Sequence, residues 1–359
     1  MKYTIVILLV FLAACSSSEI NIGVIAAQTG PIASISVPSQ HAIELALDDW
    51  NGDPSHTKIN VIFEDNKGKP VDSANAFHKL QIDGVAAIIT DISSTTLTAA
   101  PLADAQEMHV VAYISTSPSV LGSGDYVYRT SPMNLEGMSL VSDHMLDSGQ
   151  TRIVTLTEHL DYTLALSEVF KEGADGLTIV AAEEFAANDD VKSTLLKLTK
   201  HNPDAIMIFS HAPYSGIYVA KQIKELGIDI PVYGSETMGS DMAVEIDAST
   251  LEGLMVGSPV YDLERMPELQ KKYNAKFNDK IFDWLYVATA YDAAMVLFDA
   301  IDEVGTDGAA IKQYLDDVEN VNGYSGFNSF DDQGDVAEGK YGLFKVVNGT
   351  KVIVSQQTT

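Results

Sequence analysis

Four hydroxyl side chains stand in a row at Ser93-Ser94-Thr95-Thr96, between the apolar stretch "GVAAIIT" and the helix-like "LTAAPLADAQ". In an open parallel sheet, ligands bind in the crevice beyond the carboxyl ends of the strands. The N-terminus of a helix offers unpaired backbone N–H groups and the positive end of the helix dipole. Capping that helix needs only one hydroxyl. The run therefore predicts either a helix cap or a site for an anionic group such as a carboxylate.

A second hydroxyl cluster follows the next apolar run, "HVVAYIST", which continues into Ser117-Pro118. Hydroxyls both donate and accept hydrogen bonds, so two such clusters on adjacent strands would suit a ligand that carries both signs of charge. Taken alone, the second cluster is typical of a polar loop before a proline. Later in the chain, "IPVYGSETMG" places Glu236 beyond another strand end, where it could bind an ammonium group, cap a helix or be solvated. Together these residues predict a site for a zwitterion.

The elements that must position these side chains alternate regularly along the chain. Runs rich in Val, Ile and Leu, separated by segments of helical period, are typical of parallel sheets covered by helices on both faces. The alternation is interrupted at "GDYVYRTSPMNLEG", and after "LEGLMVGSPV" the chain becomes strongly helical. It ends on a predicted hairpin whose turn is Asn348-Gly349. The pattern predicts an α/β fold of two Rossmann-like lobes joined by several chain crossings.

The N-terminus predicts a lipoprotein. Residues 1–14 combine a short basic start with the apolar "TIVILLVFLAA", which is typical of a signal peptide. Leu12-Ala13-Ala14-Cys15 resembles the lipobox of prokaryotic lipoproteins, so we expect Cys15 to carry lipid and residues 15–18 to form the lipidated N-terminus; the alternative is an ordinary secretory signal with a cysteine by chance. We expect an extracytoplasmic protein, in the periplasm or at the cell surface, anchored by this lipid, with no further apolar run of membrane-spanning length. Cys15 is the only cysteine, which excludes an internal disulfide.

Charge and motif content exclude several classes of function. The chain has 50 acidic and 22 basic residues and a net charge of −28, which makes nucleic acid and anionic lipid surfaces poor partners. We find no Gly-x-Ser-x-Gly motif, no P-loop and no metal-ligand spacing. The eight histidines are dispersed, and only His159 and His211 are expected near the crevice. The sequence therefore predicts no enzyme, no catalytic residue, no cofactor and no metal.

The order of several motifs resembles the periplasmic leucine/isoleucine/valine-binding proteins, the receptors of branched-chain amino-acid ABC transporters. The motifs are "TGPIAS", "DISSTTLTAAPLA", "YVYRTSP", "NPDAIMIFSH", "LEGLMVGSP", "ATAYDAAMVLFDAI" and "SFDDQGD". The resemblance implies the type I periplasmic binding fold, with two lobes that close on the ligand. It implies three crossings, near Ser131-Pro132, Ser258-Pro259 and Asn328-Ser329. Lobe 1 would comprise residues 19–131 plus 261–328, and lobe 2 residues 132–260 plus 329–359.

The resemblance also implies a role for each site residue. The hydroxyl and N–H of Ser94 would hold the α-carboxylate of an amino acid. The carbonyl of Ser115 and the hydroxyl of Thr116 would meet its amino group, for which Glu236 would be the acidic partner. Tyr162 would be an aromatic contact from the second lobe, although a tyrosine there could equally pack or cap. The implied partners are an amino acid, branched-chain or otherwise aliphatic, and the permease subunits of an ABC transporter, and the protein would be a monomer.

Three departures from the family leave the ligand side chain open. Ile35 stands where the family often has an aromatic residue, "SHAP" (residues 210–213) replaces a tyrosine-rich stretch, and Ser93 stands where a disulfide cysteine would be. One alternative is a receptor of the same fold for amides, urea or other small polar solutes. Another is a lipoprotein that regulates or senses rather than transports. Glu236 distinguishes an amino-acid receptor from the first alternative, because a neutral ligand would leave this carboxylate without a cation in a closing site.

Overall fold

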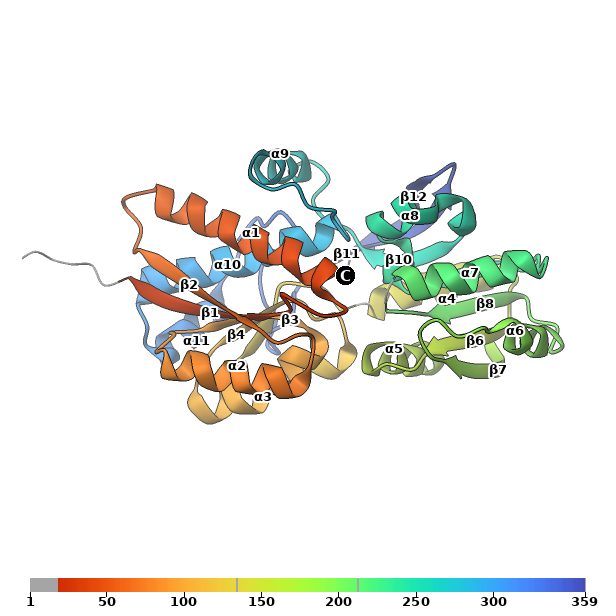
Figure 1. The fold of residues 1–359 in the computed structure, drawn as a ribbon, viewed down its shortest axis with the longest axis horizontal. Helices are drawn as coiled ribbons and strands as arrows, with labels where there is room; N and C mark the ends of the chain where they lie inside the picture. Colours follow the sequence, from red (N-terminus) through yellow and green to blue (C-terminus); the bar gives the residue numbers. More distant parts are fainter. Residues whose placement is uncertain (1–18, 134, 212, 359) are drawn as a thin grey trace, which may run out of the picture.

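The computed structural model describes residues 19–358 apart from residues 134 and 212, and its two lobes lie side by side (Figure 1). The sheet of lobe 1 has five parallel strands in the order β2-β1-β3-β4-β5, and the sheet of lobe 2 has seven strands, not all parallel, in the order β12-β11-β10-β9-β8-β6-β7. The predicted α/β class with two Rossmann-like lobes is confirmed. The second sheet is mixed, because β11 pairs antiparallel with both β10 and β12.

The strands of lobe 1 are β1 (Ile20–Ala26), β2 (Ile59–Asp65), β3 (Ile88–Ile92), β4 (Val110–Ile114) and β5 (Val127–Arg129). Those of lobe 2 are β6 (Arg152–Glu158), β7 (Thr178–Phe185), β8 (Ala205–Phe209), β9 (Val232–Gly234), β10 (Met255–Pro259), β11 (Lys340–Val347) and β12 (Thr350–Thr358).

Helices cover both faces of each sheet, as the strand composition predicts. In lobe 1, α1 (Ala33–Gly52) and α10 (Trp284–Val304) pack on one face, while α2 (Pro70–Ile82) and α3 (Ser93–Gln106) pack on the other. The helices α9 (Met266–Lys276) and α11 (Gly308–Asp317) complete this lobe against α1 and α10. In lobe 2, α4 (Leu135–Asp147) and α5 (Asp161–Glu172) lie on one face, and α6 (Lys192–Thr199), α7 (Pro213–Glu225) and α8 (Asp241–Leu251) lie on the other.

The central helix α10 is apolar on almost all sides. Within the described residues it is the one helix long and apolar enough to cross a membrane, but 83% of its apolar window is buried inside the fold. The expectation that no further segment has this length and composition is therefore wrong. The segment is a core helix, which is the usual reason for a helix to be hydrophobic all round.

Two local details concern helix starts, and a third confirms a predicted turn. The helix α1 begins at Ala33, so Pro38 lies inside the helix. All four hydroxyls of the run fall in the first turn of α3, and the residue before them, Ile92, makes no side-chain cap. The predicted hairpin turn is confirmed between β11 and β12, with φ values of 51° and 78° at Asn348 and Gly349, as a type I′ turn requires.

The chain crosses between the lobes three times. The first crossing lies between Thr130, whose hydroxyl donates to a carbonyl of α10 (2.8 Å), and the start of α4. The second follows the end of β10, because the N–H of Asp262 already donates to the carbonyl of Tyr324 in lobe 1 (3.2 Å). The third lies later than the predicted position at Asn328-Ser329.

The third crossing is displaced because residues 329–336 lie with lobe 1. Phe330 packs in the core of lobe 1, and Val336 forms an isolated bridge with it. Asp335 pairs with Arg129 of β5. The chain therefore enters lobe 2 between Val336 and the start of β11, and the predicted assignment of residues 329–336 to lobe 2 is corrected. The predicted signal peptide (residues 1–14) and lipidation site (Cys15) lie outside the described residues.

Candidate functional site

The two predicted hydroxyl clusters meet at the carboxyl ends of adjacent strands. β3 and β4 are parallel neighbours, with Ile92 opposite Ile114. The hydroxyl of Thr96 lies 2.6 Å from that of Ser115, and Ser93 Oγ accepts from the N–H of Ser117 (3.2 Å). The prediction that both clusters lie at one edge of the sheet is therefore confirmed.

Ser94 differs from the other hydroxyls of the run. Thr95 Oγ1 accepts from the side chain of Asn66 (2.8 Å), and the hydroxyls of Ser93 and Thr96 bond to the neighbouring loop. The hydroxyl of Ser94 makes no hydrogen bond to any described residue and is half-buried in the first turn of α3. Together with the unpaired N–H groups of that turn, it forms the group best placed to receive an anion.

Three of the predicted site residues converge on one carboxylate oxygen. Glu236 opens the short 3₁₀ helix η2 (Glu236–Gly239) after β9 and is 6% exposed. Its Oε1 accepts hydrogen bonds from the phenol of Tyr162, at the start of α5, and from Thr116 Oγ1 of lobe 1 (3.3 Å). Burial first, and then the charge of Glu236, raise the pKa of Tyr162 well above its usual value, so this phenol stays protonated and donates. The contact between Thr116 and Glu236 joins the two lobes.

One further aromatic ring lies near Glu236, and another lies against Tyr162. Burial and the charge of Glu236 raise the pKa of Tyr286, on α10 of lobe 1, well above its usual value. The ring of His211 packs edge-on against Tyr162 at 5.6 Å, and burial lowers its pKa, so the imidazole is neutral near pH 7. The sequence prediction missed Tyr286, because one tyrosine in a uniformly apolar helix is indistinguishable from a core residue. His211 was expected near the crevice, but no role in the site was predicted for it.

A second buried carboxylate supports the loop that carries His211. Glu158, at the end of β6, is 3% exposed and accepts from Ser210 Oγ (2.9 Å), Ser215 Oγ (3.0 Å) and the N–H of His211 (3.0 Å). These bonds fix the loop between β8 and α7. Glu158 was missed in the sequence because a charged residue at a strand end is usually solvated.

Ser115 makes two hydrogen bonds that support its own loop. Its carbonyl accepts from Arg129 Nη1 (2.8 Å), and its hydroxyl donates to the carbonyl of Asp91 (2.9 Å). Both bonds support the loop on which Ser115 lies. The contact of its carbonyl with an amino group stays a prediction. Arg129 was missed, although it lies in the conspicuous "YVYRTSP".

The described cavities lie away from these residues. One of about 240 Å³ is at the crossings, lined by Val260, Asp262 and Lys340 among others, and one of about 280 Å³ is on lobe 2 beside Glu168. At the interface between the lobes, Thr116 and Glu236 touch directly. A ligand that binds between these two residues would therefore have to enter while the lobes are apart. Three chain crossings without a rigid linker permit the lobes to separate.

A model of the family described as periplasmic binding protein matches residues 19–351. The chain belongs to this family. Among its relatives, Leu/Ile/Val-binding protein homolog 3 of Brucella melitensis is 22% identical over 348 residues, with 94% of each chain covered. The substrate binding protein LivJ of Streptococcus pneumoniae, solved in complex with isoleucine, is 21% identical with a TM-score of 0.82, covering 95% of this chain and 99% of that one. A solute binding protein of an ABC transporter from Rhodopseudomonas palustris, solved with 3,4-dihydroxybenzoic acid, is 22% identical with a TM-score of 0.83, covering 94% and 97%.

These likenesses confirm the type I periplasmic binding fold over nearly the whole described chain. Membership of the periplasmic binding proteins makes this chain a solute-binding protein of the extracytoplasmic side. The ligands of the two solved relatives differ in charge as well as in shape. Isoleucine carries an ammonium group and 3,4-dihydroxybenzoic acid does not.

Proposed function

We propose that this periplasmic binding protein captures an α-amino acid between its lobes and delivers it to the permease of an ABC transporter. The observation that carries the proposal is the meeting of Thr116, Tyr162 and Glu236 at one buried carboxylate oxygen. An ammonium inserted between the lobes would bond to Glu236 and Thr116 as a charge-assisted donor. The α-carboxylate would lie at Ser94 and the first turn of α3. The names of the curated relatives support a branched-chain or other aliphatic side chain.

Tyr286 and His211 add aromatic surface beside this position. Their rings would pack on the ligand side chain, where a neutral imidazole and a protonated phenol also tolerate a polar atom. We propose, further, that Cys15 carries the lipid that anchors the protein, which acts as a monomer.

Titration calorimetry of the full chain in mild detergent tests the ligand class. The panel contains L-leucine, L-isoleucine, leucinamide, 4-methylpentanoate and 3,4-dihydroxybenzoate. We expect binding of the two amino acids and at least tenfold weaker binding of the analogues that lack the carboxylate or the ammonium. Binding of the benzoate without binding of any amino acid would refute the proposal. Binding of leucinamide as tightly as leucine would favour the receptor for amides or other polar solutes.

A further inference from the structure

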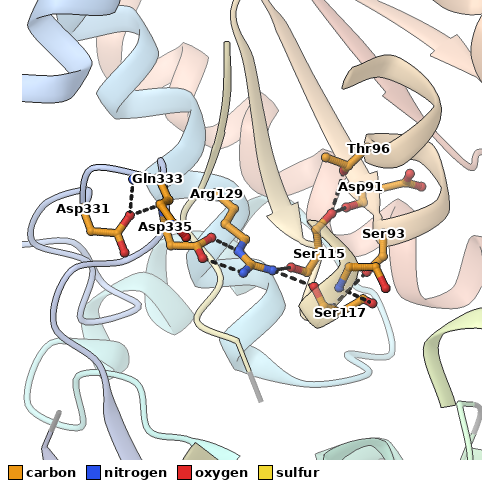
Figure 2. A network of polar contacts seen from close by, with 10 residues as sticks. Asp91, Ser93, Thr96, Ser115, Ser117, Arg129, Asp331, Gln333 and Asp335 are labelled. Atoms are coloured by element: carbon orange, nitrogen blue, oxygen red, sulfur yellow. Dashed lines mark hydrogen bonds and ion pairs between the residues drawn. The ribbon is translucent and has the colours of Figure 1, made fainter. Parts of the chain in front are cut away.

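One buried guanidinium ties two distant loops together. Arg129, the last residue of β5, has a side chain only 1% exposed. Its Nε and Nη2 both bond to the carboxylate of Asp335, with 2.7 Å between Nη2 and Oδ2 (Figure 2). Its Nη1 donates to two carbonyls, of Ser115 (2.8 Å) and Ser117 (2.9 Å). The planar fork of an arginine can hold these acceptors in one fixed geometry, which a lysine cannot do.

The first of these loops carries a proposed ligand contact. Thr116 lies between the two carbonyls that Arg129 holds, and its hydroxyl reaches Glu236 of lobe 2. On the other side of the loop, the N–H of Ser117 donates to Ser93 Oγ at the start of α3. The backbone on both sides of Thr116 is therefore fixed, and the guanidinium supplies two of the bonds that fix it.

The second loop leads directly into the third crossing. Asp331 Oδ1 accepts from the N–H groups of Gln333 (2.8 Å) and Asp335 (2.9 Å), which closes the loop on itself. The carbonyl of Gly334 accepts from the N–H of Arg129 (2.9 Å). A Cβ at Gly334, where φ is +77°, would lie 2.3 Å from the carbonyl oxygen of Val127, so only glycine allows the loop to lie this close to β5. The chain then crosses to β11.

We propose that Arg129 and Asp335 are positioning residues, which hold Thr116 in place for ligand recognition and link its position to the third crossing. Opening and closing of the lobes must change backbone dihedral angles at the crossings. At the third crossing those changes occur next to Asp335, whose carboxylate is bonded through one side chain to both carbonyls beside Thr116. The ligand assignment of Thr116 rests on the proposed function, whereas the link between the loops does not.

Hydrogen exchange of the ligand-free full chain tests the link without any ligand. Two variants loosen it: Asp335→Asn removes the charge that pairs with Arg129, and Asp331→Ala removes the acceptor that closes the loop around Asp335. Asp332→Ala is the matched control, because Asp332 is an exposed neighbour in the same loop. We expect the amides of residues 115–117 and 119 to exchange about tenfold faster in both variants, since each weakens bonds to or around a charged group. The control should match the wild type.

The exchange result is decisive even if one variant fails. If Asp335→Asn does not fold, because it leaves a buried guanidinium without its counter-charge, Asp331→Ala carries the test, since it leaves the ion pair intact. Unchanged exchange of residues 115–117 and 119 in a folded variant overturns the proposal.

A double-mutant cycle separates positioning from general stability. We expect Asp331→Ala to weaken binding of L-isoleucine about tenfold in the wild type and less than about twofold in a Thr116→Val background, because the effect acts through Thr116. Equal losses in both backgrounds would show that the loop has a merely structural role and would overturn the proposal. If the wild type binds no amino acid, the proposed function fails. The exchange experiment alone then decides whether the loop around Thr116 is linked to the loop that contains Asp335.

Discussion

Replacing Glu236 by glutamine separates recognition of an ammonium from every other contact in the site. Glutamine keeps the shape of the side chain and a carbonyl oxygen that can still accept from Tyr162 and Thr116, so only the charge is lost. The carboxylate is 6% exposed, and its partner oxygens belong to buried hydroxyls. Leaving one charge of a desolvated pair without its partner costs about 2–5 kcal/mol, or roughly 30- to 5,000-fold in affinity.

Calorimetric titration of wild type and variant with L-leucine and its des-amino analogue, 4-methylpentanoate, completes the cycle. We expect the wild type to prefer leucine strongly and the variant to discriminate poorly. Glu172→Gln, an exposed substitution at the end of α5, is the matched control and should bind as the wild type does. A coupling energy near zero between the residue and the ligand amine would refute the reasoning, because Glu236 would then not bind the ammonium.

Three further results are expected. Small-angle scattering should give a smaller radius of gyration with saturating ligand, because contacts from both lobes favour the closed form; an unchanged radius would argue against a site between the lobes. Burial raises the folded-state pKa of Asp292 from 3.8 to about 6, so the folded protein binds the proton first. The free energy of unfolding of the wild type should therefore gain about 1 kcal/mol relative to Asp292→Asn between pH 7 and pH 5, and parallel pH profiles of the two melting temperatures would contradict this. Cys15→Ala should release the protein from membranes without lowering its melting temperature, and a variant still bound after a high-salt wash would disprove lipid anchoring.

The sequence predicted the strands well, because their signal is local. "HVVAYIST" is apolar on both faces and becomes β4, all five residues of which are buried. The third crossing was misplaced because "SFDDQGD" indicates a turn but does not indicate which lobe holds it.

Site residues were predictable from the sequence only where a polar residue comes directly after a predicted strand. Ser94, Thr116 and Glu236 each follow a strand, so the topology of parallel sheets brings them to one edge of each sheet. The pairing of Arg129 with Asp335 joins residues 206 positions apart. Neither residue has a local pattern that identifies its partner, so only the folded chain reveals what holds the loop around Thr116.

The apolar length of α10 has a consequence for the route by which an exported chain leaves the cytoplasm. A segment of this length, threaded through a membrane before folding, must not be retained there as a spanning helix. Asp292 lies near its middle, and an aspartate at the centre of such a segment costs about 2.5–3.5 kcal/mol on insertion. The carboxylate that accepts bonds from Tyr324 and Ser325 in the folded lobe therefore also favours passage across the bilayer. Asp292→Leu, combined with Cys15→Ala, should leave part of the chain in the alkali-resistant membrane fraction, and full recovery in the soluble fraction would contradict this.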